Sequence, residues 1–340
     1  MIDLRSDTVT RPTPGMREAM ANCEVGDDVI DVDPTLDRLE KQVAELLGKE
    51  RALFVPSGTM SNQIAIRLHC RPGDEFLCEG GCHIYNYEQA GYAQLSGVAV
   101  RTLHGDGGVL KLADFENTIH PDDEHFAPTR LVTLENTHNR GGGRTQPYAN
   151  VEQICEWARN HGLATHLDGA RLMNAVVASG VAAKEWAQHF DTVSVCFSKG
   201  LGAPVGSALA GTHESIQIAR RHRKVFGGGM RQAGVIAAGA LYALEHQVER
   251  LADDHAKATK LGEAISAAAG LELANEKVDT NIVLFHVLES TGKTAVEVVE
   301  ELKGHDIHVF DIGPHSIRAV THLDVSAEQI DLVCSVLREM

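Results

Sequence analysis

Short apolar runs alternate with helix-length amphipathic stretches through most of the chain. Each run is a few residues long and ends in small or polar residues, as buried strands do. These predicted strands cover residues 52–55, 131–134, 164–167 and 192–197. Helical periodicity precedes the first of these strands, at 36–46, and lies between later ones, at 59–69 and 151–160. The alternation predicts an α/β fold with a mainly parallel sheet covered by helices on both faces.

The pattern of predicted helices and strands changes after about Gly228. Helices are predicted at 232–247, 251–269, 294–303 and 327–338, and strands are predicted at 281–287 and 317–320. At ~150 residues per domain, 340 residues suit about two domains. We therefore expect a large α/β domain over residues 1–247 and a smaller α+β domain over residues 248–340.

The composition is acidic. Lys and Arg number 31 against 47 Asp and Glu, which gives a formal net charge of −16 at pH 7. Such a surface repels nucleic-acid phosphates and anionic lipids, so neither nucleic acid nor membrane is expected as a partner. An anionic ligand must then be held by a local arrangement of residues.

No targeting or membrane segment is recognised. The first seven residues already carry charges, and every apolar run is shorter than the ~18 residues that cross a membrane. The seven cysteines are scattered without a C-x-x-C pair, as in reduced cytoplasmic proteins. No metal is expected, because Cys78, Cys82 and His83 have no second ligand pair and no third ligand joins His166 and Asp168.

Ligands of α/β sheets bind at the carboxyl ends of strands, so the residues that follow strands are the first candidates. The predicted strand 52–55 runs into Ser57, Gly58 and Thr59 and then into a helix. A glycine at a helix N-terminus favours a phosphate site, because free amides and the helix dipole attract anions. An ordinary helix cap by Ser57 or Thr59 is the alternative.

Two further strands end in charged residues. Asp168 follows the strand 164–167, with Arg171 three residues later. An acid there suits a cationic ring nitrogen, and a structural Asp–Arg pair is the alternative. Lys199 follows the strand 192–197 and is flanked by glycines. Partial removal of its amine from water favours covalent chemistry with a carbonyl, against a lysine that only extends to solvent.

A dinucleotide site is not expected at this lysine. The glycines at 200, 202 and 206 are spaced one residue too widely for the fingerprint, and an apolar strand-like run follows in place of a helix. His83 is the fourth candidate, since it precedes a short aromatic segment and would stack on a planar ring or act as a base. A purely structural histidine is the alternative.

The order of these residues resembles pyridoxal-phosphate enzymes of fold type I, and the local motifs resemble the low-specificity L-threonine aldolase family. The matching segments are 3–10 (DLRSDTVT), 25–28 (VGDD), 54–59 (FVPSGT), 135–139 (ENTHN), 166–171 (HLDGAR), 198–206 (SKGLGAPVG), 227–234 (GGGMRQAG) and 320–322 (VTH). The resemblance implies a seven-stranded, mainly parallel sheet and a smaller C-terminal domain, with residues 1–20 contributing to the site.

The resemblance also implies roles around the cofactor pyridoxal 5'-phosphate. Lys199 would bind it covalently, and Asp168 would pair with its pyridine nitrogen. Arg171 would hold the phenolic oxygen of the ring or steady Asp168. His83 would stack on the ring. His125 matches a second histidine that the family positions near the substrate hydroxyl.

Anion-binding residues follow from the same resemblance. Gly58 and Thr59 would bind the cofactor phosphate, with Lys224 and Arg231 lent by a neighbouring subunit, so a homo-oligomer with shared sites, either a dimer or a tetramer, is expected. The substrate α-carboxylate would be held by two residues, Ser6 and Arg318.

The activity that the resemblance implies is retro-aldol cleavage of L-threonine, L-allo-threonine and related β-hydroxy-α-amino acids to glycine and an aldehyde. The base is left open between His83, His125 and a water. Two segments depart from the family pattern: Ile30 and Asp31 replace an aromatic residue and a glycine, and the loop 140–147 is longer and richer in glycine. Another pyridoxal-phosphate reaction (racemase, β-eliminating lyase or transaminase) and a non-catalytic binding protein remain alternatives.

Overall fold

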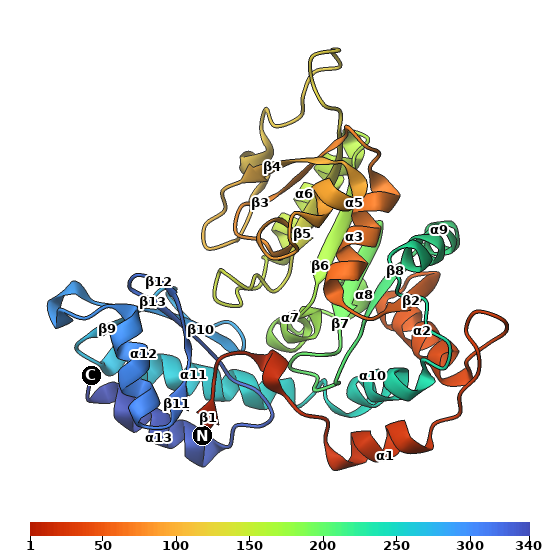
Figure 1. Cartoon of the computed structure of the whole chain (residues 1–340). Helices are drawn as coiled ribbons and strands as arrows, with labels where there is room; N and C mark the ends of the chain where they lie inside the picture. Colours follow the sequence, from red (N-terminus) through yellow and green to blue (C-terminus); the bar gives the residue numbers. More distant parts are fainter.

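The computed structural model describes residues 1–340, and its centre is a seven-stranded sheet with helices on both sides (Figure 1). The strand order is β2-β8-β7-β6-β5-β3-β4. Their bounds are Arg51–Val55 (β2), Glu75–Glu79 (β3), Ala99–Leu103 (β4), Thr129–Glu135 (β5), Ala164–Gly169 (β6), Thr192–Cys196 (β7) and Ser207–Gly211 (β8). Only β8 runs in the direction opposite to the other six strands, so the predicted mainly parallel sheet is confirmed.

Helices follow the strands as the apolar periodicity predicts. They are α1 (Pro14–Asn22), α2 (Pro34–Leu47), α3 (Gly58–His69), α4 (His83–Asn86), α5 (Gly91–Ser96), α6 (Tyr148–Asn160), α7 (Leu172–Ser179), α8 (Ala183–Ala187), α9 (His213–Val225) and α10 (Gly234–His246). Helix α2 illustrates how local sequence sets the two ends of a helix. Asp33 caps it by accepting from the amide of Leu36, Pro34 occupies the first turn, and Gly48 ends it in the left-handed conformation.

A second, four-stranded sheet lies in the C-terminal part, in the order β12-β13-β10-β9. Its strands are β9 (Leu271–Leu273), β10 (Ile282–Val287), β12 (Phe310–Gly313) and β13 (Ser316–Val320), and its helices are α11 (Leu251–Ala267), α12 (Ala295–Gly304) and α13 (Ala327–Arg338). The short 3-10 helices of the chain are η1 (Asp7–Val9), η2 (Leu112–Phe115) and η3 (Glu289–Thr291).

The start of the chain belongs to this smaller unit in space. Strand β1 (Ile2–Asp3) pairs in parallel with β11 (Ile307–His308), and Figure 1 shows the N-terminus beside α13. Ile2 and Leu4 are buried in the hydrophobic cluster of the smaller unit. The N-terminal segment therefore crosses from the smaller unit to the large sheet. The division of the chain at residues 247 and 248 remains a prediction.

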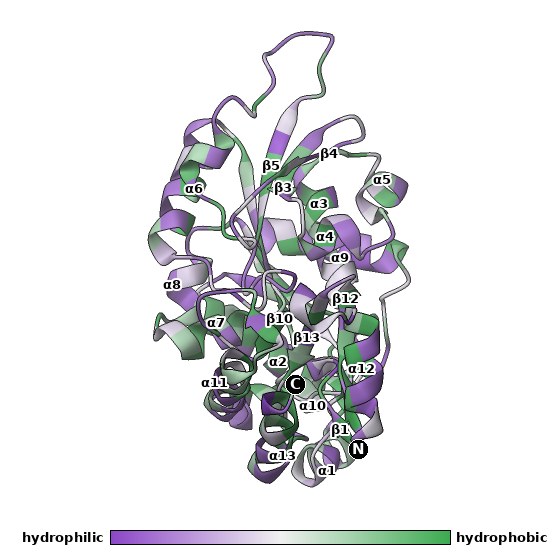
Figure 2. Cartoon of the chain, turned by 90° about the vertical axis from the view of Figure 1, so that its left-hand side faces the viewer, coloured by the Kyte–Doolittle hydropathy of each residue, from purple (hydrophilic) through white to green (hydrophobic).

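The two largest of four hydrophobic clusters form the cores of these sheets. The larger holds 40 buried residues around the central sheet, Phe54, Trp186 and Phe197 among them, and the smaller holds 23. Figure 2 shows the matching pattern, with apolar strands inside and helices such as α6 that carry both colours. No helix has the length and apolar character needed to cross a membrane. All seven cysteines are unpaired.

One segment projects from the body, between β4 and β5 (Figure 1). Every residue from 121 to 126 is exposed. The segment leads into the first residue of β5, Thr129, which pairs with Glu75 at the start of β3. Its tip therefore lies at the amino edge of the parallel strands.

Candidate active site

The carboxyl ends of β5, β6 and β7 bring the predicted residues together. Glu135 and Asp168 are paired in the sheet register, and Lys199 follows the end of β7. The N-terminal segment covers this edge, because the Thr10 hydroxyl donates to the main-chain carbonyl of Lys199 at 3.0 Å. Lys199 itself is half-buried. Asp168 and Lys199, which were predicted at the ends of separate strands, thus share one site, and Glu135 joins them there.

Asp168 is a buried carboxylate without a cation. Its side chain accepts from Asn62 Nδ2 at 2.9 Å and from the amide of Ala170 at 3.1 Å, and the residue is 2% exposed. No Lys, Arg or His nitrogen lies within 4.0 Å of it. Because an isolated buried charge is costly, this carboxylate is suited to a cationic ligand.

His83 begins α4 and is held by acids on two sides. Its amide donates to Glu135 Oε2 at 2.6 Å, and its Nδ1 lies 2.9 Å from Glu88 Oε1. Glu88 also accepts from Asn62 and Gln63, at 2.8 and 2.6 Å, so it acts as an acceptor toward all three partners. The proton of this pair is therefore on Nδ1, and Nε2 is left for chemistry.

The charges of the site set the protonation of these groups. Burial lowers the pKa of His83, but the hydrogen bond to Glu88 and the charge of Asp168 raise it by more, so the pKa lies above its ordinary value. Burial raises the pKa of Glu88. The imidazole is thus tuned to exchange a proton at a higher pH than a free histidine.

A neutral histidine supports the site from behind. His166 Nδ1 lies 2.9 Å from Thr192 Oγ1, and its Nε2 lies 3.2 Å from Asn62 Oδ1. Burial lowers the pKa of His166 to about 4, so it is uncharged at neutral pH. His166, which the metal hypothesis considered, therefore holds the amide that bridges Asp168 and Glu88.

Arg171 pairs with Asp7 and not with Asp168. Its Nε and Nη2 donate to the two Asp7 oxygens at 2.8 and 2.6 Å, and both side chains are buried. Burial raises the pKa of Asp7, but Arg171 and the charge of Lys199 lower it by more, so the pKa lies well below its usual range. This ion pair joins the N-terminal segment to the end of β6.

Arg318 projects from β13 toward the same edge and has only neutral partners. It donates to Asn139 Oδ1 at 2.9 Å and to the carbonyl of Arg5 at 3.1 Å, while its buried Nε has no partner. Burial, followed by the charge of Arg171, lowers the pKa of Arg318. Ser6 adjoins Arg5 and caps η1 by accepting from the amide of Thr8. A guanidinium without a carboxylate is free to bind one.

The predicted phosphate cradle is a helix N-terminus packed against β7. Ser57 caps α3 by accepting from Met60, so the structural alternative is also realised there. The amides of Gly58 and Thr59 belong to the first turn, where no helical partner exists for them. A Cβ on Gly58 would lie 2.8 Å from Cys196 Sγ, three residues before Lys199. Glycine therefore allows the start of the helix to approach the end of β7, the strand that leads to Lys199.

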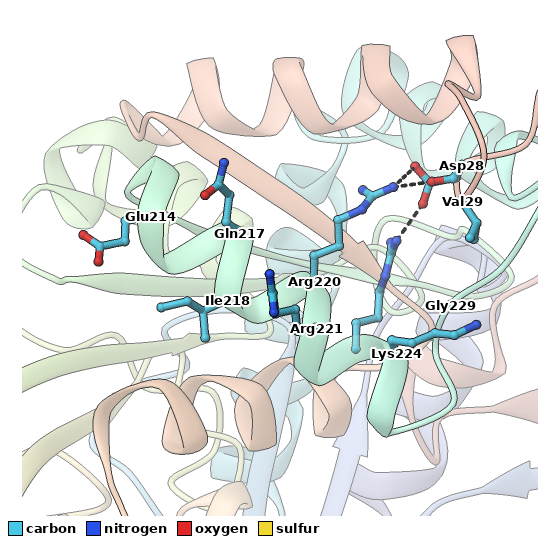
Figure 3. A pocket seen from close by; sticks show the side chains of 10 residues that line it. Asp28, Val29, Glu214, Gln217, Ile218, Arg220, Arg221, Lys224 and Gly229 are labelled. Atoms are coloured by element: carbon cyan, nitrogen blue, oxygen red, sulfur yellow. Dashed lines mark hydrogen bonds and ion pairs between the residues drawn. The ribbon is translucent and has the colours of Figure 1, made fainter.

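Lys224 lines an open groove of about 760 Å³ (Figure 3). Arg220 and Arg223 in this region both bind Asp28, at 2.8 and 2.6 Å, whereas Lys224 has no carboxylate within 4.0 Å. Arg231 pairs with Asp27 at 3.1 Å. Within one chain, no hydrogen bond joins Lys224 or Arg231 to Asp168 or to its partner Asn62.

His125 is not brought to the site by its own chain. It lies on the projecting segment, its side chain is 77% exposed, and its Nδ1 pairs with Asp123. The segment enters β5 at the amino edge, whereas Glu135 is the last of the seven residues of β5, at the carboxyl edge. Ile30, one of the departing residues, is also exposed, at 81%.

The residues present fit pyridoxal phosphate. The buried Asp168 lacks the cation that a protonated ring nitrogen would supply, Lys199 follows the neighbouring strand, and the amides of Gly58 and Thr59 start the adjacent helix. Asn62, Glu88 and Asp7 complete the arrangement and were missed by the sequence analysis. Only Asp7 had a signal, its place beside Ser6 in a matching segment. His83, Glu88 and Asp168 also have ligand atoms within 4.8 Å of one another, a spacing that a metal ion would accept.

Known proteins match the chain over most of its length. The family model described as beta-eliminating lyase matches residues 3–289. The low-specificity L-threonine aldolase 1 of Arabidopsis thaliana is 42% identical over 342 residues, which cover 99% of this chain and 96% of that protein. The low specificity L-threonine aldolase of Escherichia coli (strain K12) is 44% identical over 331 residues, or 97% of this chain and 96% of that protein.

A solved structure shares the architecture. The threonine aldolase of Leishmania major has a TM-score of 0.85 at 22% identity, and the match covers 99% of each chain. A likeness at that identity speaks for the fold, and it confirms the predicted fold-type I architecture. With a family match over most of its length and relatives more than 40% identical across nearly all of it, this chain belongs to the beta-eliminating lyase family.

Proposed function

We propose that this protein is a pyridoxal-phosphate-dependent aldolase that cleaves L-threonine, L-allo-threonine and related β-hydroxy-α-amino acids to glycine and an aldehyde. One observation carries the proposal: a buried carboxylate without a cation, Asp168, and a guanidinium without a carboxylate, Arg318, face one edge of the sheet with Lys199. Such a site is matched by a cationic ring together with an amino acid's α-carboxylate.

The cofactor would be held by residues of four elements. Lys199 would bind it covalently, Asp168 would pair with the ring nitrogen, and the amides of Gly58 and Thr59 would receive the phosphate. His83 would cover the ring. When bound, pyridoxal phosphate supplies an electron-withdrawing ring that stabilises negative charge on the Cα of an amino acid.

The α-carboxylate would be held by Arg318 and Ser6. Arg318 offers a planar fork that has no carboxylate of its own, and Asn139 and the carbonyl of Arg5 fix its orientation. Holding the carboxylate fixes which bond at Cα stands perpendicular to the ring. This orientation would select the bond to Cβ for cleavage.

His83 is the candidate base within the chain. Glu88 keeps the proton on Nδ1, so Nε2 is free to accept the proton of the substrate hydroxyl as the Cα–Cβ bond breaks. His125 would take part only from a neighbouring subunit, because its own β5 separates it from the site.

We also propose a homo-oligomer in which neighbouring chains share active sites. Lys224 has no carboxylate partner, and it lines an open groove with Gly229 and Arg220 (Figure 3). A neighbouring chain would use Lys224 and Arg231 to bind the cofactor phosphate. The seven unpaired cysteines support the cytoplasm as the proposed location.

The test is aldehyde release by the purified holoenzyme. Each substrate, threonine or allo-threonine, should give one acetaldehyde for every glycine. The cleavage rate of threonine divided by that of allo-threonine gives the stereochemical preference. Lys199→Ala should abolish release, whereas Lys303→Ala, at an exposed ion pair on α12, should leave it unchanged. The proposal is wrong if no aldehyde is released from threonine, allo-threonine or phenylserine. It is also wrong if the Cα hydrogen of alanine exchanges faster than any aldehyde is released.

A further inference from the structure

Arg140 is a half-buried arginine at the proposed site that the reaction described above does not use. It follows Asn139, the residue that binds Arg318, in the loop after β5. Its Cζ lies 5.8 Å from the ring centroid of Tyr87, and its Nη2 donates to the carbonyl of Ile312 in β12 at 3.2 Å. The guanidinium thus spans from the large sheet to the smaller one.

The loop that carries Arg140 is fixed on both sides. Gly141 accepts from Asn275 Nδ2 at 2.8 Å, and Gly143 accepts from Thr280 Oγ1 at 2.7 Å. A Cβ on Gly141 would lie 2.0 Å from the carbonyl oxygen of Gly107, so glycine is required for this close approach. The glycine-rich departure noted in the sequence therefore holds Arg140 in one position.

Charge counting separates Arg140 from the other arginines of the site. Arg171 is neutralised by Asp7, whereas neither Arg318 nor Arg140 has a carboxylate within 4.0 Å. After burial itself, the charges of Arg171 and Arg140 lower the pKa of Arg318, which means that these guanidiniums lie close enough to repel. An α-carboxylate neutralises one of the two unmatched charges. If Arg318 binds that carboxylate, the charge of Arg140 remains available to a second anion.

Arg140 and His83, the group that would meet the substrate hydroxyl, both contact Tyr87. The ring centroids of His83 and Tyr87 are 5.6 Å apart, and Arg140 stacks on Tyr87. Tyr87 thus lies between Arg140 and His83, so Arg140 is one aromatic ring away from the histidine that would meet the hydroxyl of Cβ.

We propose that Arg140 binds a carboxylate carried by Cβ, so that the substrate class includes 3-hydroxy-2-amino dicarboxylic acids such as 3-hydroxyaspartate. The inference rests on the proposed aldolase function and extends it. In the step, the hydroxyl loses its proton and its C–O bond becomes the C=O of glyoxylate. The electron pair of the broken Cα–Cβ bond stays on Cα, which takes up a proton to give glycine. Atoms and electrons balance without an oxidant.

In the rival interpretation Arg140 has only a structural role and holds the loop against β12, since its Nη2 donates to the carbonyl of Ile312. Substrate selectivity distinguishes the two, because a structural role affects charged and neutral substrates alike. The measured quantity is kcat/KM for 3-hydroxyaspartate divided by kcat/KM for 3-hydroxyasparagine, its neutral counterpart of equal size. Using this ratio removes any common effect on folding or catalysis.

The holoenzyme is compared with Arg140→Gln and Arg140→Lys. The matched control is Arg144→Gln on the same loop, where Arg144 donates to the carbonyl of Asp106 at 2.7 Å. The wild-type ratio should exceed one and fall about 10- to 100-fold in Arg140→Gln, the range for one charge-assisted hydrogen bond. It should fall less in Arg140→Lys, which keeps the charge but loses the fork. It should stay unchanged in Arg144→Gln.

A wild-type ratio of one or below overturns the proposal, as does an Arg140→Gln ratio equal to that of the wild type. Failure of the aldolase function itself is recognised separately, by the absence of acetaldehyde from threonine. In that event the dissociation constants of L-aspartate and L-asparagine for the holoenzyme decide the role of Arg140. A preference for L-aspartate that is lost in Arg140→Gln supports the proposal, and equal binding overturns it.

Discussion

Glu88 Oε1 lies 2.9 Å from His83 Nδ1, and the Glu88 side chain is completely shielded from solvent while a third of the imidazole is exposed. A buried charge thus faces an accessible histidine. Such a pair fixes both the tautomer and the orientation of the ring, and leaves its other nitrogen toward the site. Glu88 is therefore a positioning residue, acting through His83.

Replacing Glu88 by Gln should lower the pKa of His83. The carboxylate raises that pKa through a hydrogen bond and a negative charge, so its removal shifts the titration to lower pH. Aldehyde release should fall about tenfold or more, as for a disturbed proton-transfer group. NMR titration of the imidazole measures the first effect, with Glu79→Gln, beside His138, as the control. An unchanged His83 titration would contradict the assigned role.

Replacing Asp7 by Asn should destabilise the fold by about 3–5 kcal/mol at neutral pH, because Arg171 is left as an unpaired buried charge. The pKa of Asp7 is depressed in the fold, so its contribution is present above the ordinary carboxyl pKa of about 3.9 and is lost as pH falls below it. The difference between the wild type and the variant should shrink accordingly in urea unfolding at low pH.

The control for this stability prediction is Asp37→Asn, which breaks an exposed ion pair with Lys41. A surface pair contributes at most about 1 kcal/mol, so its loss should be small at every pH. Equal effects of the two substitutions would show that the Asp7–Arg171 pair does not stabilise the junction.

Replacing Gly58 by Ala should weaken cofactor binding. The added Cβ would lie 2.8 Å from Cys196 Sγ, so the start of α3, with its phosphate-binding amides, must move away from β7. Cofactor dissociation, followed by absorbance, measures the effect. Adding Cys196→Ala to the variant should restore binding by making room. Gly304→Ala, where nothing lies within 4 Å, is the control. Failure of the double variant to recover would exclude a steric cause.

Shared active sites predict complementation between inactive chains. Lys199→Ala supplies intact Lys224 and Arg231 to a neighbour, and the Lys224→Ala/Arg231→Ala double variant supplies an intact Lys199. After co-refolding in equal amounts, random pairing should restore about a quarter of the wild-type activity, since half of the pairs are mixed and each has one complete site.

The control for complementation mixes Lys199→Ala with Asp168→Ala. Both residues lie at one sheet edge of a single chain, so no mixed pair has a complete site. Recovery in the first mixture alone supports sharing. Recovery in neither mixture, with oligomers present, would refute it.

Most elements of the sheets could be predicted from the sequence where burial is continuous. Strands β2, β5, β6 and β7 are apolar runs because both faces of the sheet are covered. Strand β3 was missed because Glu residues open and close it, and β4 because it is an edge strand that carries Arg101. Strand β1, with two residues, has too little sequence to form a pattern.

The site was predictable in part for a similar reason. Asp168 and Lys199 follow apolar strands, and their position alone indicates function. Asn62 and Glu88 lie on a helix and a loop, and they meet Asp168 and His83 only through the tertiary fold. No local spacing encodes such a meeting. The partner of Arg171 was unpredictable in the same way, since Asp7 lies 164 residues away.

The pairing of β1 with β11 has a consequence for the order of assembly. Ile2 leaves the ribosome before its partner Ile307, which is made about 300 residues later. Until then the segment with Ser6 and Asp7 has no sheet to join, and Arg171 has no counter-charge. The large sheet can collapse during synthesis, but the reactive edge closes only after β11 has been made. A nascent chain should therefore bind cofactor late.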